Sequence, residues 1–378
     1  MAASITVIIE KELLDSVGDS SGTVGYMGYI LEILGICKQM KFIRNLMSKA
    51  ALRKDPTLHV REVQFGNIPV RIYEPRSLSP EKKRCVIYFH GGLCMFGTTK
   101  CYSYVCRTIA RESESIVIDI EYRLAPEHPF PAQKIDCITV LEHIQKEAEN
   151  YGVDPNRIIL AGDSSGGTMA AAACHTLVTM KDFPKPRAQV LMYPFLQSLD
   201  FSLPSYQQNK SIPMLYRKRA VKLGIKYITE DTVDFDSIIN GAHVPDELRV
   251  RYRKWISAHH IPDEFKVRGY VQPEPAPFSK KLYEVCKITF QADFSPLLVE
   301  DDIIRQVPET FLLTCEYDVL RDDGLLYKKR LEDNGVPVTW LHLKNGFHGI
   351  MFKSDQTPIT FKDAKPAWES IASFIKKF

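Results

Sequence analysis

The sequence predicts an α/β fold in which a mostly parallel central sheet is covered by helices on both faces, and three observations support it. Short apolar segments alternate with longer helix-forming segments along the chain, as they do in parallel sheets joined by crossover helices. A sharp, glycine-flanked turn holds Ser164 between such a strand and such a helix. Polar residues directly follow several strands, and the carboxyl ends of parallel strands meet at one edge of a sheet.

The composition is that of an ordinary globular chain. The 378 residues are 45 % apolar and 25 % charged, enough to bury a large core, and α/β chains of this length often fold as one unit. The net charge of +3 comes without a motif for DNA or RNA binding, so we expect no nucleic-acid partner.

Nine cysteines are scattered through apolar sequence without Cys-x-x-Cys spacing. This pattern excludes a zinc framework and a small disulfide scaffold, and we predict no metal site. Cys94 and Cys315 lie next to segments assigned below to the functional site. A disulfide bridge between these two thiols is therefore a hypothesis.

Residues 1–58 are predicted to form an N-terminal helical segment. Within it, residues 24–50 place apolar side chains on one face of a helix and basic side chains elsewhere. Such a helix either packs over the following domain as part of a cap, which we favour, or lies on a membrane surface. No stretch here reaches the roughly 20 apolar residues of a spanning helix, and no signal-peptide pattern is convincing.

The predicted strands are short, apolar and rich in β-branched residues. The first two are joined by Gly66-Asn67, a signal for a hairpin turn. The strands cover residues 60–65, 68–73, 85–89, 115–120, 158–161, 188–193, 310–314 and 338–343. The helices cover residues 132–150 and 168–178, regions near 215–228 and 246–257, and a stretch that ends at residue 334.

Ser164 lies in the sequence Gly162-Asp163-Ser164-Ser165-Gly166. Gly-x-Ser-x-Gly between a strand and a helix is the nucleophile elbow of an α/β-hydrolase. The glycines are needed because side chains at their positions would collide with the strand or the helix. A glycine-rich turn without chemistry is the alternative. A phosphate-binding loop fails because no lysine follows the glycines where that motif needs one.

His90-Gly91-Gly92 follows directly after the strand at 85–89. In this fold the loop after the third strand supplies backbone N–H groups to an oxyanion hole, and glycines let the backbone approach the substrate oxygen closely. We expect the N–H groups of Gly91, Gly92 and Ser165 to bind the oxyanion. His90 is expected to support the loop through hydrogen bonds.

An acid and a histidine follow the last two strands, in the Ser…Asp…His order of α/β-hydrolases. His348 comes after the final strand, within Gly-Phe-His-Gly; a surface loop histidine is the alternative. The acidic residues after the preceding strand are Glu316, Asp318, Asp322 and Asp323.

Residues 196–289 break the alternating pattern, because they are polar, rich in Tyr, Lys and Arg, and poor in strand signals. We interpret this stretch as a helical cap over the site, inserted into a catalytic core formed by residues 59–195 and 290–378. Asn209-Lys210-Ser211 is an N-glycosylation acceptor sequence, which has meaning only if the chain is lumenal or secreted.

Taken together, these motifs resemble the hormone-sensitive-lipase group of α/β-hydrolases, and more closely the arylacetamide deacetylase-like proteins. The likeness covers roughly residues 25–378. The motifs that carry it are His90-Gly91-Gly92, Tyr122 to Glu127, Gly162 to Gly167, Asp318 to Asp322 and Gly346-Phe347-His348.

The resemblance implies a serine carboxylesterase or lipase-like hydrolase that cleaves small hydrophobic esters, aryl amides or lipids through an acyl-enzyme, without a metal or cofactor. It implies that Ser164 is the nucleophile, Asp318 the acid and His348 the base. Leu93 stands where many relatives have a third glycine, which is expected to reshape the acyl pocket.

The resemblance also implies attachment to the endoplasmic reticulum membrane, on its lumenal side. Relatives begin with a membrane-spanning anchor, and no such helix is visible in this chain, so a soluble cytoplasmic protein is the alternative. Two other functions stay open. One is a catalytically weak lipid-binding or interaction protein. The other is a serine peptidase, disfavoured because the propeller domain of oligopeptidases is missing.

Overall fold

The computed structural model describes residues 41–42, 44–45, 54–76, 83–181, 183–212, 214–352 and 361–378. Most of the predicted N-terminal helix, and with it the predicted membrane contact of residues 24–50, lies outside these residues. The four described residues of that stretch are helical. Among them, Arg44 donates hydrogen bonds to the carbonyls of Met95 and Ala125 and pairs with Glu127. This side chain therefore contacts the loop that follows His90.

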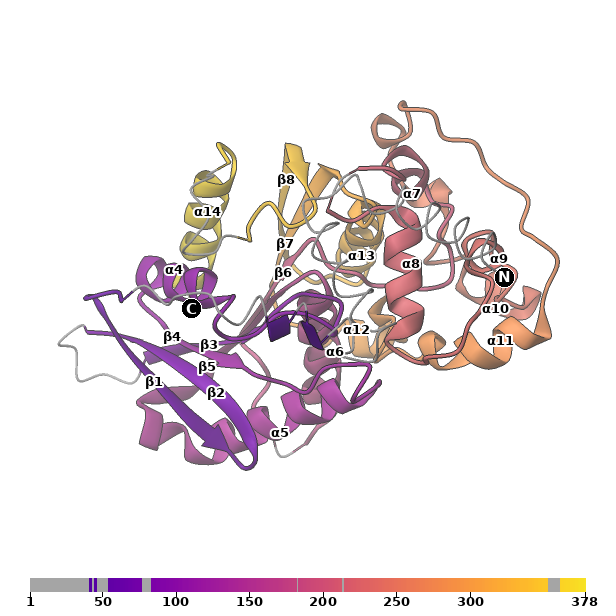
Figure 1. Ribbon diagram of the computed structural model, residues 1–378. Helices are drawn as coiled ribbons and strands as arrows, with labels where there is room; N and C mark the ends of the chain where they lie inside the picture. Colours follow the sequence, from indigo (N-terminus) through magenta and orange to yellow (C-terminus); the bar gives the residue numbers. More distant parts are fainter. Residues whose placement is uncertain are drawn as a thin grey trace.

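A single eight-stranded sheet forms the centre of the described part of the chain, with the strand order β1-β2-β4-β3-β5-β6-β7-β8 (Figure 1). β1 and β2 form the predicted hairpin, and β2 runs antiparallel to β4, whereas the pairs from β4 to β8 are parallel. The strands are β1 Leu58–Phe65, β2 Ile68–Pro75, β3 Lys83–Phe89, β4 Ile116–Ile120, β5 Val153–Asp163, β6 Ala188–Met192, β7 Thr310–Tyr317 and β8 Val338–Phe347. The predicted mostly parallel sheet is confirmed.

Helices cover both faces of this sheet because successive side chains of each strand point to opposite faces. Val86 and Tyr88 of β3 pack in one half of the core, which includes α4 and α14. Ile87 and Phe89 pack in the other half, which includes α5, α6 and α13. The bounds are α4 Ser103–Ser113, α5 Ala132–Glu147, α6 Ser165–Thr179, α12 Asp301–Ile304, α13 Arg321–Asp333 and α14 Ala364–Lys376.

The two halves of the core separate Cys94 from Cys315. Both are buried free thiols. Cys94 packs with the half that holds α5 and α6, whereas Cys315, on β7, packs with the half that holds α4 and α14. The hypothesis of a disulfide bridge between them is wrong, because the sheet lies between the two side chains.

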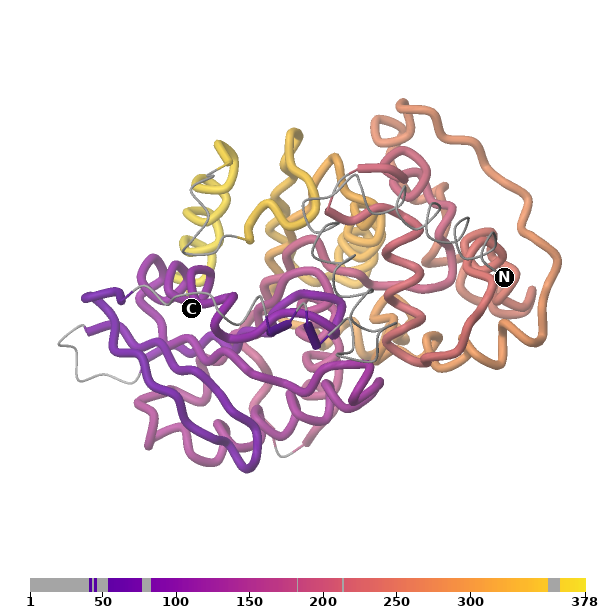
Figure 2. Tube along the Cα trace, in the orientation of Figure 1, coloured from indigo at the N-terminus to yellow at the C-terminus, as the bar shows by residue number. Residues whose placement is uncertain are grey.

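Residues 196–289 contain helices and, where the structure describes them, no strand. These helices gather at one side of the sheet, at the right of Figures 1 and 2. They are α7 Pro204–Gln208, α8 Arg217–Lys226, α9 Phe235–Ile239, α10 Asp246–Tyr252 and α11 Lys280–Cys286. The division into a core and an inserted cap stays a prediction.

Candidate active site

Ser164 occupies the turn between β5 and α6 in a conformation that few side-chain-bearing residues adopt, with φ +54° and ψ −124°. Such a conformation is strained and persists only where the surroundings enforce it. A Cβ atom on Gly162 would lie 2.3 Å from the carbonyl oxygen of Gly166, and one on Gly166 would lie 1.9 Å from that of Phe89. Both glycines are therefore required by close backbone packing around Ser164.

Three side chains from distant parts of the sequence meet at the carboxyl ends of β5, β7 and β8. Ser164 Oγ lies 2.9 Å from His348 Nε2, and His348 Nδ1 lies 2.8 Å from Asp318 Oδ2. Asp318 is fully buried, and its Oδ1 accepts the backbone N–H of Leu320 at 2.9 Å. Each group in this chain is thus oriented by the next one.

The other three acidic residues in the loop after β7 have different partners. Glu316 pairs with Arg321, Arg268 and His342. Asp322 pairs with Arg321 and accepts the N–H of Ser205, and Asp323 accepts the N–H of Leu196. Of these four acidic residues, Asp318 is the one that contacts His348 in the part of the chain that the structure describes.

Burial alone would raise the pKa of Glu316, but the hydrogen bond from His342 and the charges of Arg321 and Arg268 outweigh it and lower the pKa to about 2. An acid with a depressed pKa in the folded state contributes stability above the pKa of about 4 that it has when unfolded. This contribution is lost as the pH falls towards 2.

We expect Glu316→Gln to lower the thermal midpoint at pH 7 but to lower it much less at pH 2 to 3, where the wild-type carboxylate is itself becoming protonated. Calorimetry of both proteins over pH 2.5–7 measures the difference. An equal loss at every pH would show that the ion pairs of Glu316 do not stabilise the fold through its charge.

The loop after β3 differs from the prediction at Gly91. Its backbone N–H donates to Asp163 Oδ1 at 2.8 Å, so it is not free to bind an oxyanion, and the expectation that it does so is wrong. Asp163 also accepts the hydroxyls of Tyr88 at 2.8 Å and Tyr102 at 3.2 Å. Burial raises the pKa of Asp163, although the hydrogen bonds from Tyr88 and Gly91 oppose this shift.

The contact between Asp163 and Gly91 fixes the loop beside the nucleophile. Gly92 follows with φ +109° and Leu93 with φ +58°. Within the described residues, the N–H groups of Gly92, Leu93 and Ser165 have no hydrogen-bond acceptor. Unpaired backbone donors beside a buried serine are suited to bind an oxyanion.

His90 is buried within the same loop. Its Nδ1 lies 2.8 Å from the carbonyl oxygen of Gly91, and its ring stacks on Tyr122 with the centroids 4.2 Å apart. The Tyr122 hydroxyl donates to the carbonyl of His90 at 2.5 Å. Burial lowers the pKa of His90, which favours the neutral ring.

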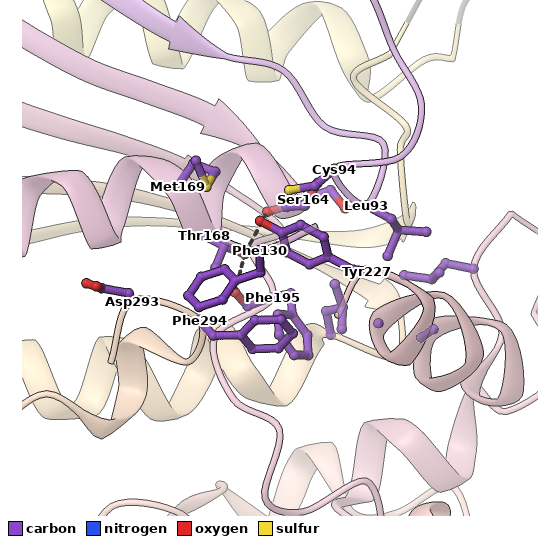
Figure 3. A pocket seen from close by; sticks show the side chains of 15 residues that line it. Leu93, Cys94, Phe130, Ser164, Thr168, Met169, Phe195, Tyr227, Asp293 and Phe294 are labelled. Atoms are coloured by element: carbon purple, nitrogen blue, oxygen red, sulfur yellow. Dashed lines mark hydrogen bonds between the residues drawn. The ribbon is translucent and has the colours of Figure 1, made fainter. Parts of the chain in front are cut away.

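A pocket opens beside Ser164 (Figure 3). Leu93 and Cys94 line it from the loop after β3, and Met169 lines it from α6. Phe294 lies among further aromatic side chains of the lining, with ring centroids 5.4 Å from Phe130, 5.9 Å from Phe195 and 5.6 Å from Tyr227. The lining is almost entirely apolar, as expected of a pocket for a hydrophobic group.

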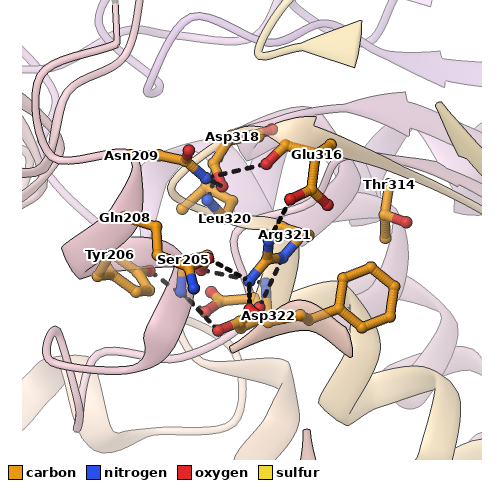
Figure 4. A network of polar contacts seen from close by, with 12 residues as sticks. Ser205, Tyr206, Gln208, Asn209, Thr314, Glu316, Asp318, Leu320, Arg321 and Asp322 are labelled. Carbon is orange, nitrogen blue, oxygen red and sulfur yellow. Dashed lines mark hydrogen bonds and ion pairs between the residues drawn. The ribbon is translucent and has the colours of Figure 1, made fainter. Parts of the chain in front are cut away.

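Asn209 is fully buried, although its sequence is that of a glycosylation acceptor. Its Nδ2 donates to the carbonyl oxygens of Glu316 at 3.0 Å and Asp318 at 2.9 Å (Figure 4). The amide nitrogen that would carry a glycan is therefore enclosed and occupied, and the predicted glycosylation is wrong for the folded chain. Sequence reasoning missed this role because it depends on contacts more than 100 residues away.

Over the residues that the structure describes, no group of three or more His, Cys, Asp or Glu side chains is placed to hold a metal ion. In the same residues, no helix is both long and apolar enough to cross a membrane.

Sequence comparisons with known proteins agree on one family, and a solved structure shares the fold. Residues 86–248 and 280–352 match a family described as having the alpha/beta hydrolase fold. Human arylacetamide deacetylase-like 4 is 44 % identical, over 93 % of this chain and 86 % of its own length. Bovine arylacetamide deacetylase is 37 % identical, over 87 % of this chain and 84 % of its own length. A crystal structure of a thermostable esterase from Pseudomonas putida, 21 % identical, superposes with a TM-score of 0.66 over 89 % of both chains.

Proposed function

The chain belongs to the α/β-hydrolase family, among the arylacetamide deacetylase-like proteins, and on that premise we propose that it cleaves hydrophobic carboxylic esters and aryl amides through Ser164, His348 and Asp318. The observation that carries this proposal is the unbroken hydrogen-bonded chain from the buried carboxylate of Asp318 through His348 to Ser164 Oγ. Relatives named for deacetylase activity and solved esterases of the same fold support a serine carboxylic-ester hydrolase.

In the proposed reaction, His348 Nε2 takes the hydroxyl proton of Ser164 as Oγ attacks the carbonyl carbon of the substrate. Asp318 holds the imidazole in the tautomer with a proton on Nδ1 and stabilises the positive charge that forms. His348 then gives the proton to the leaving alcohol or amine. Water, activated by the same histidine, attacks the acyl-enzyme and releases the acid.

The negative charge on the carbonyl oxygen is met by backbone N–H groups. We assign this role to Gly92 and Ser165, with Leu93 as the next available donor, because the N–H of Gly91 is bound to Asp163. Losing one such donor typically costs about 3 to 4 kcal/mol in the transition state. Leu93 in place of a third glycine keeps its main-chain donor, and its side chain lines the pocket.

The purified chain is expected to hydrolyse a short-chain nitrophenyl ester and an aryl acetamide, and to react once with a fluorophosphonate. Modification of the Ser164 hydroxyl by the fluorophosphonate should abolish hydrolysis of the ester and of the acetamide together. Labelling without turnover of any ester would instead favour a binding protein with a weak site. Cleavage of peptides in preference to esters would favour the peptidase alternative.

The apolar lining of the cavity supports a substrate with a hydrophobic group, and Gly224 leaves space beside that lining. Gly224 lies within α8 and lines the cavity. A Cβ at this position would meet no atom within 4 Å. Because glycine inside a helix costs about 1 kcal/mol relative to alanine, we infer that this glycine keeps space open for substrate.

We expect Gly224→Leu to lower kcat/KM for the long members of an ester series by roughly 10-fold or more, since each excluded methylene costs about 1 to 3 kcal/mol of discrimination. Acetyl esters of small alcohols should be affected little. Two series, one lengthened in the acyl group and one in the alcohol, show which side enters the cavity. Lys222→Leu on the same helix is the matched control, because Lys222 does not line the cavity. An unchanged ratio of long to short esters in both series contradicts the assignment.

A further inference from the structure

Asn209 joins the helical region to the loop that carries Asp318. The residue follows α7 directly, and its buried Nδ2 donates to the carbonyls of Glu316 and Asp318. Ser205, one turn earlier on α7, donates from its Oγ to the carbonyl of Val319 at 2.6 Å. Asn209 and Ser205 together therefore hold three backbone carbonyls of residues 316–319. Figure 4 shows Asn209 beside Glu316 and Asp318.

The chemistry of the neighbours fixes the orientation of the Asn209 amide. Its Oδ1 accepts a hydrogen bond from Arg268 Nη2 at 3.1 Å. A guanidinium only donates and a backbone carbonyl only accepts, so the amide oxygen must face Arg268 and the NH₂ group must face the two carbonyls. Arg268 also donates to the backbone carbonyl and the side chain of Glu316. The amide is thus held on both sides.

The hydrogen bond from Asn209 to the Asp318 carbonyl lies close to the reacting groups. The carbonyl that Asn209 binds and the carboxylate that contacts His348 belong to the same residue. Rotation of the Asp318 backbone would move Oδ2 relative to His348 Nδ1. Leu320 holds the other carboxylate oxygen, but its N–H belongs to the same loop. Asn209 and Ser205 provide anchorage for this loop from a different part of the chain.

We propose that Asn209 is a positioning residue, which orients Asp318 against His348 by clamping the 316–318 backbone. This role rests on the proposed function. It also makes the orientation of Asp318 depend on how α7 packs against the loop. The residue touches neither substrate nor the reacting atoms, so its effect is expected in kcat and in the pH profile, with little change in KM.

The test replaces Asn209 by leucine, which has a similar size and no hydrogen-bonding group. We expect kcat for a nitrophenyl ester to fall by on the order of 10- to 100-fold, since small misplacements of catalytic groups have effects of this size. Because a misaligned Asp318 stabilises protonated His348 less, the acidic limb of kcat/KM should move to lower pH. If N209L folds poorly, Arg268→Gln takes its place in the test, because the Arg268 side chain is more exposed. We expect it to change kcat and the pH profile in the same directions by smaller amounts.

Gln207→Leu is the matched control. The Gln207 amide also donates to two carbonyls, those of Ser202 at 2.7 Å and Val271 at 2.9 Å, but neither belongs to the 316–319 loop. Its kcat and pH profile should match wild type. Ser211→Ala removes the glycosylation sequence and leaves Asn209 in place, so it should also match wild type.

Each outcome separates the clamp from the function on which it rests. If N209L and R268Q keep wild-type kcat and pH profile while wild type reacts with fluorophosphonate at Ser164, the clamp is overturned and the function stands. If S211A loses as much kcat as N209L, a glycan at Asn209 accounts for the loss and the clamp is overturned. If wild type itself does not react at Ser164, the proposed function fails first.

Discussion

Ser164→Ala is expected to lower kcat for any ester substrate by on the order of 10⁶-fold, because removing the nucleophile of a serine triad costs about as much as removing the whole triad. The main-chain donors and the cavity stay in place, so substrate binding should persist. Stopped assays with a nitrophenyl ester and gel detection of a fluorophosphonate label measure both losses in one preparation.

Ser165→Ala is the matched control for that change. Ser165 is the adjacent residue and lines the same cavity, but the role proposed for it uses its backbone N–H, which alanine retains. We expect its kcat to stay within a few-fold of wild type. If S165A were inactive and S164A active, the elbow would present the wrong serine for the proposed mechanism.

Asp318→Asn should have the second-largest effect, a loss of about 10⁴-fold in kcat with a small change in KM. An asparagine in this place can present its NH₂ group to His348, which favours the tautomer that cannot accept the proton of Ser164. The steady-state constants of the variant at pH 8 test this.

Glu316→Gln is the control for Asp318→Asn, because Glu316 lies in the same loop and its carboxylate contacts Arg321 and His342 but not His348. Its kcat at pH 8 should remain close to that of wild type. Equal losses in E316Q and D318N would mean that the charge of the loop, and not the contact of Asp318 with His348, supports the reaction.

Local sequence predicted the parts of this molecule that depend on local geometry. The Gly-x-Ser-x-Gly turn requires glycines because Gly162 and Gly166 pack backbone against backbone. This constraint can be recognised in the sequence, because it acts within residues 162–166. The eight strands were predictable because buried parallel strands are short apolar runs. The placement of His348 and Asp318 after successive strands followed from that topology.

Local sequence could not predict contacts between distant segments. The carboxylate of Asp163 binds the N–H of Gly91, 72 residues earlier, and this removes a donor that the His-Gly-Gly motif suggested. Asn209 carries the sequence of a glycosylation site, yet in the fold its amide is buried and donates to the carbonyl of Asp318. The amphipathic helices α4 and α14 also went unpredicted, although they pack on one face of the sheet.

If Ser164 Oγ carries the acyl group during the proposed reaction, the acyl-enzyme can be trapped on that atom. The protein is mixed with a slowly hydrolysed ester, quenched in acid within seconds and analysed by mass spectrometry before and after proteolysis. We predict a mass increase of one acyl group in place of one hydrogen, located on Ser164 in the peptide that spans the elbow. An acyl group on another residue would rule out Ser164 as the nucleophile. Steady consumption of this slow ester with no adduct on Ser164 would rule it out as well.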